Sequence, residues 1–306
     1  MTMPRRIIPG KTYLLSRRCT QREFRLSPAG KVPLLFAYAL ALIAERYGVE
    51  VHIAVCMGNH YHLVLTDRLG RIPDFARDFH SITARAINSM QGEWEAMWSS
   101  GRVSLVELVD VGDLWRKLIY VLANPVEAGL VHRLSDWPGF ATRPIEHERA
   151  PKVFRRPKIP FLRRSTMAPE ATLRLTVPTM LGEMTPKAFA RELRERLAIR
   201  EAEIRAVRKV EGRRIAGARR VANQPPTSRP RSKALRRGLD PAIAAKEAPK
   251  RVAALRALRV FRDLYRRALE LWRKHLHPVV FPYGTFKMRN HPGVLIAAPP
   301  PQAFAA

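Results

Sequence analysis

Two short histidine and tyrosine patterns are the residues of this chain whose spacing could support chemistry. His60 and His62 form a His-x-His pair inside residues 60–66, a segment that reads as a β-strand. Side chains at positions i and i+2 of a strand point to the same face, so both imidazoles could reach one metal ion. Imidazole is the commonest metal ligand in proteins, but a His-x-His pair on a strand is more often structural.

Tyr120 and Asn124 form the second pattern, about sixty residues later, in a segment that reads as a helix. Positions i and i+4 of a helix share a face, so the Asn124 amide oxygen could be a third metal ligand while the Tyr120 hydroxyl faces the same ion. Taken alone, a tyrosine inside a helix is usually a core aromatic. An asparagine before a proline is usually a turn residue.

The amino-acid sequences of the two segments are more specific than the spacing of their histidine, tyrosine and asparagine residues. Residues 57–65 (MGNHYHLVL) resemble the histidine–hydrophobic–histidine motif of the HUH single-tyrosine transposases. Residues 120–131 (YVLANPVEAGLV) resemble the tyrosine helix of the REP-associated branch of that family. The resemblance extends over about residues 5–145, and Gly58 departs from it, because the family commonly has proline there.

This resemblance to the REP-associated tyrosine transposases implies a fold, a cofactor and a reaction. The implied fold is α+β, with an antiparallel ferredoxin-like or RRM-like sheet, and the implied cofactor is Mg²⁺ or Mn²⁺ at His60, His62 and Asn124. The implied activity is that of a metal-dependent single-stranded DNA transposase or endonuclease, which cleaves and rejoins DNA through a 5′-phosphotyrosine on Tyr120. Its implied partner is single-stranded or hairpin DNA, such as a repeat palindrome.

The elements that must position these residues are predicted from hydrophobic periodicity and from capping signals. Asp110 has the position of a helix N-cap, and Pro125 predicts that the tyrosine helix ends near Asn124. The predicted order is strand 12–19, helix 33–47, strands 49–56 and 60–66 as a hairpin, helix 73–90, strand 104–109 and the tyrosine helix. An antiparallel sheet with helices packed on it fits this order.

Charge divides the chain of 306 residues, whose formal net charge is +29. Residues 1–150 carry 19 Lys and Arg against 15 Asp and Glu, and residues 151–306 carry 36 against 11. We therefore predict a catalytic domain over residues 1–150, a basic linker over 151–184 and a basic, mainly helical extension over 185–306. The extension is expected to contain helices over residues 187–214 and from Pro249 to residue 275, a last strand over 279–288, and a disordered tether near 218–238.

Such a basic excess indicates a polyanionic partner, most simply nucleic acid. Arg17 and Arg18, at the end of the first strand, are candidate phosphate contacts, as are Arg155 and Arg156 in the basic, proline-interrupted segment after residue 150. The extension is expected to add salt-sensitive DNA affinity. Two other functions stay open on the sequence: a catalytically inactive, domesticated DNA-binding protein, and an RNA-binding protein.

Composition also bears on the compartment. Two cysteines, Cys19 and Cys56, exclude a disulfide framework and a cysteine-based zinc site. The longest apolar run, residues 32–44, is shorter than the roughly 20 residues that cross a bilayer. A cytoplasmic, nucleoid-associated protein without a membrane partner is expected, and a homodimer is left open.

Overall fold

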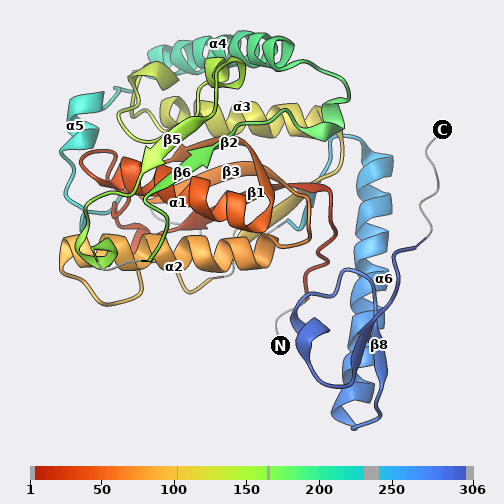
Figure 1. The fold of residues 1–306 in the computed structure, drawn as a ribbon. Helices are drawn as coiled ribbons and strands as arrows, with labels where there is room; N and C mark the ends of the chain where they lie inside the picture. The colour runs from red at the N-terminus through yellow and green to blue at the C-terminus, as the bar shows by residue number, and fades with distance from the viewer. Residues whose placement is uncertain (1–3, 102, 164–165, 231–240, 301–306) are drawn as a thin grey trace.

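The computed structural model describes residues 4–101, 103–163, 166–230 and 241–300. It has an α+β architecture in which helices cover both faces of a central sheet (Figure 1). The core elements are β1 (Lys11–Arg18), α1 (Val32–Tyr47), β2 (Val49–Cys56), β3 (His60–Asp67), α2 (Ile72–Gln91), β4 (Ser104–Leu108) and α3 (Val111–Glu127). The C-terminal elements are β5 (Lys152–Arg155), β6 (Glu170–Leu173), α4 (Pro186–Val210), α5 (Ala218–Ala222), β7 (Ile243–Ala244), α6 (Ala248–Arg273), β8 (Val279–Phe281) and β9 (Val294–Ile296).

The sheet has the strand order β2-β3-β1-β4-β7. The first four strands form antiparallel pairs, including the predicted β2–β3 hairpin, but β7 pairs with β4 in parallel. The sheet is therefore mixed, and the expectation of a purely antiparallel sheet was wrong. The added strand, β7, contains only residues 243 and 244. A strand of two residues is too short to show the alternating hydrophobic pattern by which strands are predicted from sequence.

Successive side chains of the strands pack alternately into two separate hydrophobic cores, one on each face of the sheet. Leu15 and Leu63 point toward α1 and α2, whereas Leu14 and Val64 point toward α3 and α4. This alternation follows from the two-residue repeat of a strand. It also fixes which strand residues share a face with α3, the helix that carries the predicted tyrosine.

Helix α3 begins where the sequence predicts but ends later. The Asp110 carboxylate accepts a hydrogen bond from the backbone N–H of Asp113, which confirms the predicted N-cap. The helix continues through Pro125 to Glu127, past the predicted end near Asn124. Pro125 lacks the N–H that would bond the carbonyl four residues earlier, and its burial in the last turn, together with that of Val121, Leu122 and Val126, offsets this loss.

The residues after 150 pack on the core more extensively than a linker and tether would. Residues 152–155, expected in the linker, form β5, which pairs with β6 beside α1. Helix α4 packs on α3 through the fully buried Phe189 and Leu193. The start of the expected tether is α5, and residues 231–238 of it lie outside the described residues.

The last part of the chain, α6 with β8 and β9, stands beside the sheet layers (Figure 1). The expected final strand over 279–288 ends at Phe281, because Pro282 and Gly284 follow it and lead into a turn. The chain then returns as β9, parallel to β8. No helix in the described part of the chain is both long and apolar enough to cross a membrane.

Candidate active site

His60 and His62 lie on β3 with both rings on the α3 face of the sheet. Their ring centroids are 4.9 Å apart. His62 lies opposite Ser16 of β1 in the antiparallel register, and the Ser16 Oγ is 2.5 Å from His62 Nδ1. The hydroxyl thus occupies one ring nitrogen and leaves Nε2 of His62, a buried atom with no hydrogen-bond partner among the described residues.

His60 is oriented in the same way by a different neighbour. Its Nδ1 lies 2.7 Å from the Asn59 Oδ1, and the ring also interacts with the side chain of Asn124 on α3. Burial lowers the pKa of His60 to about 4, and the charge of Arg18 acts in the same direction. Burial also holds the pKa of His62 well below its ordinary value, so both rings are neutral near pH 7 and can act as metal ligands.

Tyr120 projects from α3 over the histidine pair. Its ring centroid is 5.4 Å from that of His62, and its side chain interacts with Asn124, one helical turn further on. Tyr120 is 39% exposed, so its hydroxyl is open to a large substrate. Burial of the ring and the charge of Glu127 raise the pKa of Tyr120, so the free side chain is a neutral phenol near pH 7.

His60, His62 and Tyr120 line one open cavity of about 540 Å³, which we name the catalytic cavity after its proposed role. Arg17, Arg18 and Arg22 contribute positive charge to its wall, and Ser104 of β4 contributes a hydroxyl. Arg17 donates to the carbonyl of Ser99 over 3.5 Å and lies over the Trp98 ring. A cationic wall beside a tyrosine hydroxyl suits a phosphodiester substrate.

The side chains of His60, His62 and Asn124 together fit a divalent metal ion that keeps some coordination positions open. Two imidazole nitrogens and one amide oxygen converge from β3 and α3, and the orphaned Nε2 of His62 is a ready ligand atom. Within the described residues, no group of three His, Cys, Asp or Glu side chains is arranged for metal binding. An ion here would therefore take Asn124 as its third protein ligand and keep positions for water and phosphate oxygens.

Two of the predicted DNA contacts lie elsewhere. Arg155 is exposed on β5 and pairs with Glu170 over 3.1 Å. Arg156 donates to the carbonyl of Met167 over 2.5 Å. Both residues belong to the β5–β6 region beside α1, whereas Tyr120 lies on the opposite face of the sheet.

Three residues of the site escaped the sequence prediction: Ser16, Asn59 and Arg22. Ser16 meets His62 only through the β1–β3 register, which the sequence does not state. Asn59 stands next to His60, between the two strands of the predicted hairpin. Arg22 follows the predicted strand, in a left-handed backbone conformation with φ of 63°, and brings its charge back to the cavity.

Comparisons with known proteins give similarity in structure but not in sequence. No family model and no curated protein matches the chain. A REP-associated tyrosine transposase bound to a REP hairpin is 21% identical, with a TM-score of 0.41, over 49% of this chain and 87% of that chain. A provisionally assigned transposase from Deinococcus radiodurans R1 is 19% identical, with a TM-score of 0.28, over 40% of this chain and 95% of that chain.

Over about half of its length, the chain is similar to a REP-associated tyrosine transposase.

Proposed function

We propose that this chain is a metal-dependent DNA transposase or endonuclease that cleaves and rejoins single-stranded or hairpin DNA through Tyr120. The observation that carries the proposal is the convergence of Tyr120, His62 and Asn124 from two separate elements. The Tyr120 and His62 rings are 5.4 Å apart, and the Asn124 side chain influences the pKa of both Tyr120 and His60. A tyrosine with only a packing role would be expected in the apolar core, not beside an open cavity lined by arginines.

The chemistry follows from the groups present. The Tyr120 oxygen, after losing its proton to solvent, forms a bond to the phosphorus, and the bond from phosphorus to the 3′-oxygen breaks. The leaving oxygen takes a proton and becomes a free 3′-hydroxyl, while the 5′ side stays attached as a phosphotyrosine. The reverse attack by a 3′-hydroxyl rejoins the strand without ATP, because the ester bond is conserved.

Each neighbour of Tyr120 has a part in this scheme. His60, His62 and Asn124 would hold Mg²⁺ or Mn²⁺, which when bound offsets the negative charge of the phosphate. Ser16 and Asn59 keep the two imidazoles turned toward the cavity. Arg18 and Arg22 line the wall and would position the phosphates on either side of the cleaved bond.

We also infer that the four-stranded part of the sheet is ferredoxin-like. The chain order strand, helix, two strands, helix, strand supports this inference, as does the β2-β3-β1-β4 arrangement of antiparallel pairs. In this description β7 is an addition at the β4 edge.

A covalent-trapping experiment tests the proposed function. Purified protein is incubated with labelled single-stranded hairpins and Mn²⁺, and a DNA-linked band is sought on a denaturing gel. We expect a band in the wild type and in Tyr47→Phe, a tyrosine on α1 whose hydroxyl bonds Asp78, and no band in Tyr120→Phe. Hairpin binding without any band would favour the alternative of a catalytically inactive, domesticated DNA-binding protein.

A further inference from the structure

A second cavity, of about 370 Å³, lies behind the catalytic cavity, and we name it the rear cavity. Leu15 and Leu105 line it, whereas the adjacent residues Ser16 and Ser104 line the catalytic cavity. Neighbouring residues of a strand point to opposite faces of the sheet. One layer of sheet, at the paired positions of β1 and β4, therefore separates the two cavities.

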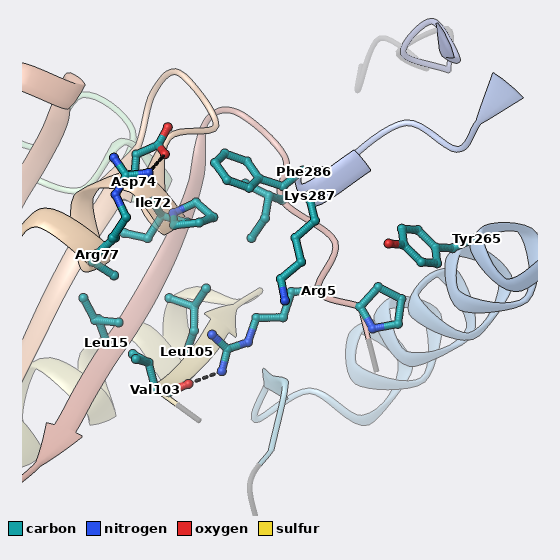
Figure 2. A pocket seen from close by; sticks show the side chains of 14 residues that line it. Arg5, Leu15, Ile72, Asp74, Arg77, Val103, Leu105, Tyr265, Phe286 and Lys287 are labelled. Carbon is teal, nitrogen blue, oxygen red and sulfur yellow. Dashed lines mark hydrogen bonds and ion pairs between the residues drawn. The ribbon is translucent and has the colours of Figure 1, made fainter. Parts of the chain in front are cut away.

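The walls of the rear cavity come from the core and from the C-terminal elements (Figure 2). The core supplies Ile72 and Leu105, α6 supplies Tyr265, and the segment after β8 supplies Phe286. The Phe286 ring is held in place, since the Arg289 guanidinium lies 4.0 Å from its centroid and also pairs with Asp74 over 3.3 Å. The cavity thus has a preformed apolar and aromatic wall.

The polar groups of this cavity are mainly cationic. The Arg5 side chain donates to the carbonyl of Val103, and the Lys287 ammonium points into the cavity toward Arg5 (Figure 2). Asp74 lines the cavity too, but its charge is offset by an ion pair of 2.8 Å with Arg77 and by the pair with Arg289. A ligand that suits these walls has a flat aromatic ring and an anionic group.

We propose that the rear cavity binds an unpaired nucleotide of the same DNA strand that is cleaved at Tyr120, which rests on the proposed function. Its base lies against Phe286 and the apolar wall, and its phosphate lies near Lys287. Aromatic side chains with neighbouring cations are the usual means of holding single-stranded nucleic acid. The volume also falls within the roughly 300–1,000 Å³ that is usual for such ligand sites.

The edge of β4 offers a path between the two cavities. β7 pairs with β4 at Glu107 and Leu108, the end of the strand that lies away from Ser104. In this proposal, the DNA strand leaves the catalytic cavity at Ser104 and passes this edge of β4 to enter the rear cavity. The C-terminal elements then contribute to the reading of unpaired DNA beside a hairpin.

Photochemical crosslinking tests this assignment. The full chain carrying Tyr120→Phe is bound to hairpins with unpaired flanks that contain 5-iododeoxyuridine at one flank position each. Peptides crosslinked after irradiation are identified by mass spectrometry. We expect one or two flank positions to crosslink to Phe286 or Tyr265. Crosslinks that map only to other parts of the chain would overturn the proposal.

A salt titration provides a second readout with conservative variants. Binding of a hairpin with flanks and of the same hairpin without them is measured by fluorescence anisotropy. For the flanked hairpin, Lys287→Gln should lower the slope of log K against log salt by about 0.7, the value for one lost phosphate contact in single strands. The unflanked hairpin should show no change, and neither should Lys274→Gln, an exposed lysine at the end of α6. Equal slopes for wild type and Lys287→Gln on the flanked hairpin would contradict the proposal.

The two proposals fail in distinguishable ways. Crosslinking and anisotropy need no cleavage, so a rear-cavity crosslink without any covalent Tyr120 adduct would refute the enzyme and retain the nucleotide site. An adduct at Tyr120 with crosslinks only elsewhere would do the reverse.

Discussion

Asp110 links α3, the helix that carries Tyr120, to the C-terminal part of the chain, and its removal gives the sharpest stability prediction. Its Oδ1 accepts from the backbone N–H of Asp113 over 2.6 Å, at the start of α3. Its Oδ2 accepts from the backbone N–H of Lys246 over 2.5 Å and of Glu247 over 3.2 Å, at the start of α6. One buried carboxylate thus holds the ends of two helices.

The expected cost of Asp110→Ala follows from these three hydrogen bonds. Loss of an N-cap costs about 0.5–2 kcal/mol, and a hydrogen bond to a charged group contributes about 1.5–3 kcal/mol. Because the freed N–H groups can partly bind water, we expect a loss of about 2–4 kcal/mol in the free energy of unfolding. Thr185→Ala is the matched control, since Thr185 caps α4 through one exposed bond of 3.2 Å and should cost only about 1 kcal/mol.

The effect of Asp110 should also depend on pH. Burial alone would raise the pKa of Asp110, but the backbone N–H groups of Asp113, Glu247 and Lys246 outweigh it and hold the pKa below its ordinary value. A carboxyl whose pKa is lowered by folding stabilises the protein above its unfolded pKa of about 3.9, and this contribution is lost as the pH falls through the folded pKa. The difference between wild type and Asp110→Ala should therefore persist from about pH 8 to 5 and narrow below about pH 4.

Urea unfolding of the full chain, followed by circular dichroism, measures these differences. An Asp110→Ala variant no less stable than Thr185→Ala would refute the reasoning. So would a difference from wild type that stays constant below the unfolded pKa.

Three further predictions concern other parts of the molecule. Ser16→Ala should weaken Mn²⁺ binding about 10- to 100-fold in calorimetry, because His62 loses the partner of its Nδ1, and Ser16→Thr should restore it. Gly129→Ala should cost about 1–2 kcal/mol in urea unfolding, since Gly129 has a φ of +69° and a Cβ there would meet the Arg208 guanidinium; an unchanged midpoint would contradict this. Leu193→Ala on α4 should cost about 2–5 kcal/mol if α4 belongs to the core, and a loss below about 1 kcal/mol would show that α4 is only loosely attached.

Much of the core fold is readable in the sequence because its signals are local. The hydrophobic periods predict α1, α2 and the β2–β3 hairpin nearly to the residue, and Asp110 predicts the start of α3. The same local rule gave the wrong end for α3, since Pro125 lies in a buried last turn. A proline signal states what the backbone disfavours, but not what packing can offset.

The features that the sequence did not predict depend on contacts between distant residues. The parallel pairing of β7 with β4 joins residues 243 and 107, and the packing of α4 on α3 joins Phe189 to Trp115. The high content of basic residues after residue 150 favoured a solvent-exposed extension over a packed one. Helix α4 nevertheless buries one apolar face and exposes its arginines on the other. In the site, the motifs indicated His60, His62, Tyr120 and Asn124, whereas the contact of Ser16 with His62 required the strand register.

Mass spectrometry of the trapped complex tests the central claim most directly. The wild-type chain is incubated with hairpin DNA and Mn²⁺, digested with protease and nuclease, and searched for a peptide that carries a nucleotide. The account predicts a 5′-phosphotyrosyl nucleotide on Tyr120, with a free 3′-hydroxyl on the released strand. A nucleotide attached to any other residue, or cleavage that persists in Tyr120→Phe, would contradict it.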